Sequence, residues 1–269
     1  MKTSRAFYWL IAVILCSVVA TTITINGRAT QAATPRAISL PTAAVQVPQF
    51  NGQVVTWGPS SGNLHRLPAN TTSGVKQIAV GDHHALAIVA NNTVVGWGIN
   101  INGELTIPRT LTNVVQVTTG ITHSAALNST GSVVIWGSQN VLNQGRTFSN
   151  IVQIASGDNH VVMLRNGGGL LVAGGTVAQR TLPSGFNCGG TVLCDPNRAA
   201  VAVAAGRDSS IVLSANGDIT QWGSARTVPA GAATDMVRIF ATGNIYAGIK
   251  NDGTLILWGA VDTLDISTL

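Results

Sequence analysis

The sequence predicts an all-β protein made of repeated antiparallel sheets, and three observations support that class. Apolar residues make up 45% of the 269-residue chain and charged residues only 9%, which favours a large core over disorder. Thirty glycines accompany short β-branched runs, a combination typical of strands joined by tight turns. The dipeptide Trp-Gly recurs at intervals of about 40 residues, which indicates a structural repeat.

Two independent markers define the repeat. Both series contain one step of 49 residues among steps of 36 to 40, so they share one period. The Trp-Gly dipeptides begin at Trp57, Trp97, Trp136, Trp222 and Trp258, with a degenerate copy, Ala173-Gly174, between the third and the fourth. The leading glycines of the units are Gly81, Gly120, Gly157, Gly206 and Gly243.

Each unit reads as short strands joined by glycine turns. Asn216-Gly217 and Asp252-Gly253 are strong hairpin signals, and Thr130-Gly131 resembles them. A unit of this size cannot bury its own faces, and stacking copies around an axis solves this. The sequence therefore predicts a β-propeller of about six four-stranded antiparallel blades. A β-solenoid is the competing architecture, but its rungs are usually shorter.

The first unit is incomplete. Val47 precedes Trp57 by ten residues, whereas the matching Val117 precedes Trp136 by nineteen, so about one strand is missing. Residues 260–269 follow the last Trp-Gly and carry four apolar side chains. We hypothesise that this tail supplies the missing strand and closes the ring. The alternative is an incomplete ring that needs another protomer.

The N-terminus has the pattern of an export signal. Lys2 and Arg5 precede an unbroken apolar stretch, and small residues follow at Gln31-Ala32-Ala33. We expect a signal peptide at 1–33 and a propeller domain at 34–269, and hence a secreted or extracytoplasmic protein. The alternative is an uncleaved N-terminal anchor, which would be the chain's one contact with a membrane.

The charge balance argues against nucleic acid as a partner. The formal charge of +5 includes Lys2, Arg5 and Arg28 of the leader, and without them 12 basic side chains face 10 acidic ones. The remaining arginines are scattered and form no phosphate-binding stripe.

Cys188 and Cys194 lie within an insertion, 184–198, that accounts for the long step of the repeat. A zinc site needs four ligands, and no histidine or second cysteine pair accompanies them. In an oxidising compartment the pair is expected to form a disulfide that closes a surface loop, with two free thiols as the alternative. No metal or cofactor site is predicted.

Residues that could carry chemistry are dispersed by the repeat. His84, His123 and His160 occupy one repeat position in three different units, so buried structural imidazoles that bridge backbone groups are favoured over a metal site. The tryptophans are expected to pack between blades. A hydrolase needs two converging carboxyl groups, and the spacing of the aspartates delivers no such pair. The chain is therefore not expected to be an enzyme.

The loops after the leading glycines are the predicted binding surface, because repeat symmetry places them on one rim. They contain Asp82, His83, Ile121, Thr122, Asp158, Asn159, Arg207, Asp208, Asn244 and Ile245.

The repeat also resembles a known family. The pattern Gly-x-x-His-x-x-Ala-Leu followed by Gly-x-Val-x-x-Trp-Gly is similar to the repeat of the regulator of chromosome condensation family, with the best copies at 84–98 and 123–137. The resemblance covers about residues 44–269 and implies a propeller, usually of seven blades. The spacer 97–108 resembles the secreted bacterial branch, which includes a β-lactamase inhibitor protein. The match is specific for fold and weak for function.

Together these observations predict an exported, monomeric propeller without catalytic activity that binds or scaffolds another protein through its rim loops. The alternatives are a glycan-binding or glycan-acting propeller enzyme and a cell-envelope structural module.

Overall fold

The computed structural model describes residues 52–57, 63–138, 148–188, 194–224 and 227–260. This part of the chain contains fifteen strands in five separate three-stranded sheets. Within it, no helix is long and apolar enough to cross a membrane. The expected signal at 1–33 and most of the C-terminal tail lie outside the described residues.

The element bounds follow the repeat closely. The first sheet holds β1 (Gln77–Val80), β2 (His84–Ile88) and β3 (Val94–Gly98), and the second holds β4 (Val114–Thr119), β5 (His123–Asn128) and β6 (Val133–Gly137). The third holds β7 (Ile151–Ser156), β8 (His160–Arg165) and β9 (Leu170–Gly174), and the fourth holds β10 (Ala200–Ala205), β11 (Ser209–Ser214) and β12 (Ile219–Gly223). The fifth holds β13 (Met236–Thr242), β14 (Ile245–Lys250) and β15 (Leu255–Gly259). The short helices are η1 (Ala69–Thr71), η2 (Ala90–Asn92), α2 (Val177–Arg180) and η3 (Ala230–Ala232).

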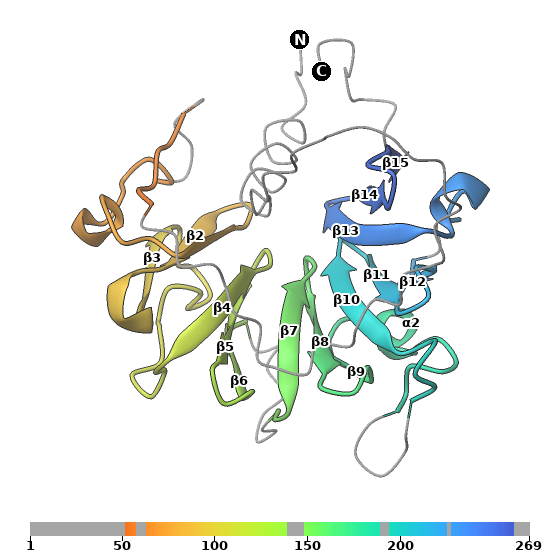
Figure 1. The fold of residues 1–269 in the computed structure, drawn as a ribbon. Coiled ribbons are helices and arrows are strands. Elements are labelled where there is room, and N and C mark those ends of the chain that lie inside the picture. Colours follow the sequence, from red (N-terminus) through yellow and green to blue (C-terminus); the bar gives the residue numbers. More distant parts are fainter. Residues whose placement is uncertain (1–51, 58–62, 139–147, 189–193, 225–226, 261–269) are drawn as a thin grey trace, which may run out of the picture.

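Each sheet is an antiparallel meander in which the second strand lies between the first and the third. The sheets follow one another along an arc, with β4, β7, β10 and β13 on its inner side (Figure 1). This radial arrangement is that of a β-propeller, so the predicted fold class is confirmed. We call the parts of the chain that end in Trp57, Trp97, Trp136, Ala173, Trp222 and Trp258 units 1 to 6.

The described blades have three strands rather than the four that the sequence suggested. In units 3 to 5, one backbone hydrogen bond on the outer edge replaces the fourth strand, for example Val133 N to Phe148 O and Ile219 N to Ala233 O. Prolines shape this edge, because proline cannot donate to a ladder and favours a turn. The carbonyl of each proline in this position accepts a hydrogen bond from the backbone N–H three residues later. These prolines are Pro68, Pro108, Pro183 and Pro229.

Stacking between neighbouring sheets forms the core. The second strands β2, β5, β8 and β11 are buried along almost their whole length, on both faces. Their side chains join clusters that span two units, such as Ala125 and Leu127 with Ile151 and Ile154. Sheets inside the arc therefore have both faces covered by their neighbours.

A glutamine at one repeat position clamps each of three blades to the next. Gln116 Oε1 accepts from Ile154 N at 2.9 Å, and its Nε2 donates to Ile154 O at 2.9 Å. Gln77 and Gln153 make the same pair of bonds to Val117 and Val203. The side-chain amide thereby satisfies a peptide group that would otherwise be buried without partners.

The three repeated histidines form a second link between blades. They are fully buried, and Nε2 lies 3.0 Å from Ser124 Oγ for His84, 3.2 Å from Ser156 Oγ for His123 and 2.7 Å from Ser210 Oγ for His160. Each serine belongs to the following unit. The structural role expected of these residues is present, but a serine hydroxyl of the next blade is the partner at Nε2, where backbone groups were expected.

Burial keeps these imidazoles neutral. Burial, reinforced by His160 and His84, lowers the pKa of His123 to about 3. Burial lowers the pKa of His160 to about 4, although Asp208 opposes it, and lowers the pKa of His84 against the opposing charge of Glu104. The protonated form would lose hydration that the interior does not replace.

We expect Gln116→Ala to lower the free energy of unfolding by about 1–3 kcal/mol, because it leaves the peptide groups of Ile154 without partners. Urea denaturation followed by circular dichroism measures the change. Gln53→Ala, at an exposed position, is the matched control and should have no effect. Equal stability of the two variants would contradict the clamp.

We expect stability to fall as the pH is lowered from about 6.5 to about 5. The unfolded chain takes up protons on histidine in this window, whereas the folded chain does not. Each buried histidine therefore lowers the free energy of unfolding by about 1.4 kcal/mol for each pH unit. His123→Gln should reduce this slope, and the exposed His83→Gln should leave it unchanged. Denaturation midpoints measured across this window decide the matter, and identical slopes for all three proteins would refute the assignment.

Candidate functional site

One edge of the blades gathers two sets of loops. The first and third strands of a meander run in the same direction, so the turn after the first strand and the loop after Trp-Gly lie at the same edge. A repeated bond joins the two sets, for example Ile99 N to His83 O at 2.7 Å and Ser138 N to Thr122 O at 2.8 Å. Equivalent bonds join Gly175 to Asn159, Ser224 to Asp208 and Ala260 to Asn244. We call this edge of the propeller the loop face.

The Trp-Gly glycines make this junction possible. Gly98 and Gly137 have φ values of 112° and 106°, in the left-handed region that side chains rarely adopt. A Cβ at Gly137 would lie 2.6 Å from Thr122 O. The glycine of each of these Trp-Gly pairs is therefore needed for the third strand to meet the rim turn.

The predicted rim residues lie on the loop face, with one exception. Asp82, His83, Asn159, Arg207 and Asp208 are exposed, and Ile121, Thr122, Asp158 and Asn244 are partly exposed. Ile245 was expected on the rim but is only 3% exposed. In unit 6 the turn is shortened to Gly243-Asn244, so Ile245 already begins β14 and points into the core.

Backbone bonds around the inner side of this face hold the rim turns in place. Ile121 N donates to Asp158 O at 3.1 Å, and Asp158 N donates to Arg207 O at 3.3 Å. Arg207 N in turn donates to Gly243 O. The turns of units 3 to 6 are thus connected blade to blade.

The leading glycines allow the blades to approach this closely. A Cβ at Gly81 would lie 2.6 Å from Gly120 O, and one at Gly120 would lie 2.7 Å from Gly157 O. Gly157 and Gly206 face the carbonyl of the next leading glycine in the same way. The repeated marker therefore reflects packing at the hub.

A cavity of about 280 Å³ lies on the inner side of the arc, lined by the first strands and the leading glycines. Asp82 and Asp158 border it, and Arg207 Nε lies 3.5 Å from Asp158 Oδ2. Burial raises the pKa of Asp158, and Asp82 and Asp208 add to this while Arg207 opposes it. The carboxylates of Asp82, Asp158 and Asp208, which belong to three different blades, therefore interact electrostatically.

Two apolar side chains on the loop face were not found by the sequence reasoning. Ile101 is 82% exposed and Val177 is 72% exposed. They occupy matching places, each the third residue after the last glycine of a third strand, in units 2 and 4. Their shared offset in the repeat was the available signal. They place apolar surface beside the polar rim.

Both apolar residues sit on loops that are fixed from within. Beside Ile101, the backbone N and Nδ2 of Asn102 each donate to the Glu104 carboxylate at 2.8 Å. Beside Val177, Thr176 caps α2, and the Gln179 side chain accepts from Thr176 N. Such loops lose little conformational entropy on binding.

The insertion begins as part of the core. Cys188 and Cys194 form the expected disulfide. Phe186 is 3% exposed and packs in the cluster between units 4 and 5, and its carbonyl accepts from Leu170 N. The bridge therefore fixes the point at which the loop leaves the blade.

The described residues contain no group of three or more histidine, cysteine, aspartate or glutamate side chains placed to hold a metal ion. The loop face combines fixed loops, two exposed apolar side chains and a few charged side chains. Such a combination suits contact with the surface of another molecule.

Comparisons with known proteins agree with this architecture. The family described as Regulator of chromosome condensation (RCC1) repeat matches residues 75–104, which contain β1 to β3. No curated protein sequence matches the chain.

Several solved structures are similar in fold. The CRINKLY WD40 ectodomain of the Arabidopsis thaliana receptor kinase ACR4 is 20% identical, with a TM-score of 0.56, over 76% of this chain and 71% of that chain. Human WBSCR16 is 19% identical, with a TM-score of 0.54, over 69% and 61%. Prp20p from Saccharomyces cerevisiae is 22% identical, with a TM-score of 0.52, over 70% and 57%. The chain thus spans less than two thirds of the length of the last two.

At this level of identity the likeness concerns the fold, and the repeat match identifies its building unit. Residues 75–104 match the regulator of chromosome condensation repeat, and the chain shares the β-propeller fold of these similar structures.

Proposed function

We propose that this protein is an extracytoplasmic propeller that binds another protein through its loop face and has no catalytic activity. The observation that carries the proposal is the pair Ile101 and Val177, which are strongly exposed on loops fixed from within. An apolar side chain on a loop that is already fixed can serve as an anchor for a protein partner, because little conformational entropy is lost on binding.

The geometry of the loop face supports a protein rather than a small ligand. Ile101 and Val177 follow the third strands of units 2 and 4, so a partner that contacts both must span three blades. The polar rim residues lie nearer the hub than these loops, so such a partner would contact polar groups between two apolar anchor points.

The charges on the rim favour a partner with a basic patch. Asp82, Asp158 and Asp208 contribute three carboxylates, and Arg207 is the cation next to them. Complementary charge speeds association more than it adds affinity. Raising the salt concentration is therefore expected to slow the encounter.

The likeness to Prp20p supports a protein as the class of partner. The description of that structure includes binding properties to Gsp1p and histones. Those partners belong to Prp20p. For this chain the partner is proposed only as a protein.

Export rests on two supports. The Cys188–Cys194 disulfide is a bond that persists in oxidising compartments, and the similar ACR4 structure is a receptor ectodomain. The signal pattern at 1–33 and the resemblance of the 97–108 spacer to a secreted branch agree with them. We propose that cleavage after the Ala32-Ala33 pair releases the propeller domain as a monomer.

Replacing Ile101 and Val177 together by Asp should weaken binding at least about tenfold, a loss of about 1.4 kcal/mol in binding free energy. The partner is a protein captured from outside the cytoplasm of the cells that make this chain. Leu255→Asp is the matched control, because Leu255 is 45% exposed at the opposite edge, where β15 begins. Biolayer interferometry with the purified partner measures the affinities. Equal affinity of the double variant and the control would place the binding surface elsewhere.

A glycan-acting enzyme would give a different result. Purified protein that hydrolyses a glycan, with the activity abolished by a single Asp→Asn change, would overturn the proposal.

The double change of Cys188 and Cys194 to Ser should lower the free energy of unfolding by on the order of 2 kcal/mol. In protein recovered from outside the cytoplasm, neither thiol should react with an alkylating reagent until a reductant is added. Mass spectrometry of the alkylated peptide reads this out. Free thiols in the recovered protein would contradict both the bridge and its proposed compartment.

A further inference from the structure

Three of the four tryptophans in the described sheets bond to the connecting segment of the preceding unit, whereas Trp258 Nε1 donates to the Gln221 side chain. Nε1 of Trp97 donates to Leu64 O at 2.9 Å, and Nε1 of Trp136 donates to Glu104 O at 2.7 Å. Trp222 donates to Gln179 O at 2.9 Å. All three acceptors are backbone carbonyls of the segment that follows the preceding unit's third strand. Leu64 and Glu104 are the seventh residues after Trp57 and Trp97.

Apolar residues of the same connecting segments cover the indoles. Leu105 and Ile107 pack in the cluster that contains Trp136, and Leu64 and Leu67 pack in the cluster of Trp97. The result is that Trp97, Trp136 and Trp222 are only 5–7% exposed. A buried indole with a satisfied N–H is the usual state of this side chain.

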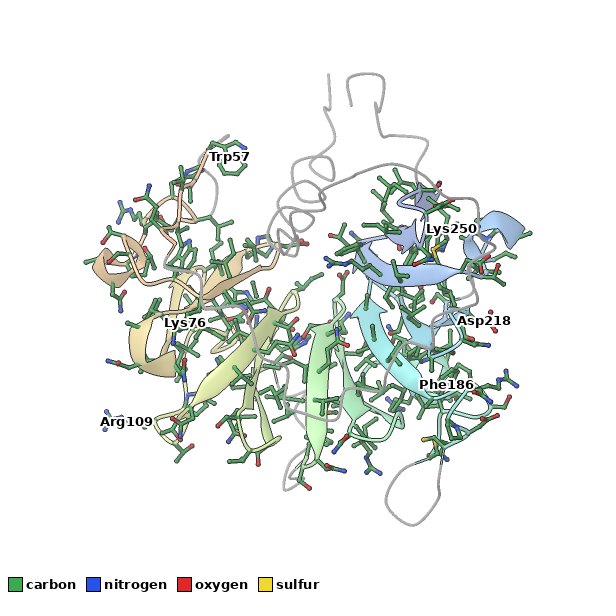
Figure 2. All side chains as sticks on the ribbon, viewed as in Figure 1. Trp57, Lys76, Arg109, Phe186, Asp218 and Lys250 are labelled. Carbon is green, nitrogen blue, oxygen red and sulfur yellow. A yellow bond between two sulfur atoms is a disulfide. The ribbon has the colours of Figure 1, made fainter. Side chains whose placement is uncertain are left out.

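Trp57 departs from this pattern. It is 62% exposed, and Val55 on the same face is 60% exposed. Figure 2 shows Trp57 at one open end of the arc, away from the neighbouring sheet. The face of the last complete blade that would precede it in a closed ring lies at the other end (Figure 1).

The backbone of this segment is nevertheless in its proper place. Val75 N donates to Gly52 O at 3.0 Å, as Met236 N does to Gly217 O at 3.0 Å. Val54 N donates to Thr71 O at 2.9 Å, as Ile219 N does to Ala233 O at 3.0 Å. Unit 1 therefore presents a segment that is hydrogen-bonded in the place of a third strand, and its outer face has no cover among the described residues.

The chain supplies a matching cover. In a closed ring, unit 6 precedes unit 1, and the segment that follows Trp258-Gly259 corresponds to the connecting segments that cover the other indoles. Asp265 is the seventh residue after Trp258, the position of the carbonyls that accept from Trp97 and Trp136. Leu264 and Ile266 flank it and offer the apolar side chains that the other connecting segments use.

We propose that residues 261–269 dock on the face formed by Val55 and Trp57, and that the backbone carbonyl near Asp265 accepts a hydrogen bond from Trp57 Nε1. The tail then closes the ring as a connecting segment. This differs from our hypothesis that it adds a missing strand, and it follows from the repeated tryptophan contact. The inference is independent of what the loop face binds.

Quenching of tryptophan fluorescence by acrylamide tests the docking in the full chain. The Trp57 signal is obtained as the difference between the wild-type chain and Trp57→Phe. We expect this signal to be protected in the wild type and to become several-fold more accessible in the double variant Leu264→Asp, Ile266→Asp. Leu255→Asp, on an exposed apolar residue away from this face, is the control and should leave the signal unchanged.

Hydrogen exchange gives a second readout that does not depend on variants of the tail. Amides of 261–269 should exchange slowly in the wild-type chain and several-fold faster in Trp57→Ala, a change at an exposed position of the described structure. Equal exchange in both chains overturns the proposal. So does protection of Trp57 that the tail variant leaves intact, or that appears only as protein concentration rises, which would indicate a second copy.

Discussion

The structure depends on the burial of the second strand of each sheet between the two neighbouring sheets. A three-stranded meander has two apolar faces, and in β5 and β8 both are covered by the adjacent units. Stability is therefore shared across unit boundaries rather than contained in a blade. Several polar side chains inside this packing find partners in the next unit, as Gln116 does with Ile154 and His160 does with Ser210.

The same constraint accounts for the residues that repeat. Leading glycines such as Gly120 leave room for the next unit's backbone at the hub, and a larger residue would hold the blades apart. The Trp-Gly glycines let the third strand end against the rim turn, and the tryptophans fasten the preceding unit. These markers were visible in the sequence because each meets the same steric or hydrogen-bonding demand in several units.

Features set by local departures from the repeat could not be predicted in this way. The fourth strand was expected from the length of the units, but segments such as that of Pro183 form turns and contribute one edge bond instead. Ile245 was placed on the rim by counting from Gly243, and the shorter turn of unit 6 moved it into the core. Ile101 and Val177 share an offset in the repeat, but their exposure depends on how each loop folds, as that of Ile101 does around Asn102 and Glu104.

Departures from the repeat also indicate where function can reside. Between units 5 and 6 the glutamine clamp is absent, because Ala202 occupies its position, and other contacts replace it. Ser209 bonds to Tyr246, and Trp258 Nε1 donates to Gln221 Oε1 at 3.2 Å. Units 5 and 6 therefore remain linked by side-chain hydrogen bonds, although the residues differ from those at the other unit boundaries. Ile101 and Val177 take part in no such joint, which is why the proposed protein-binding surface includes them.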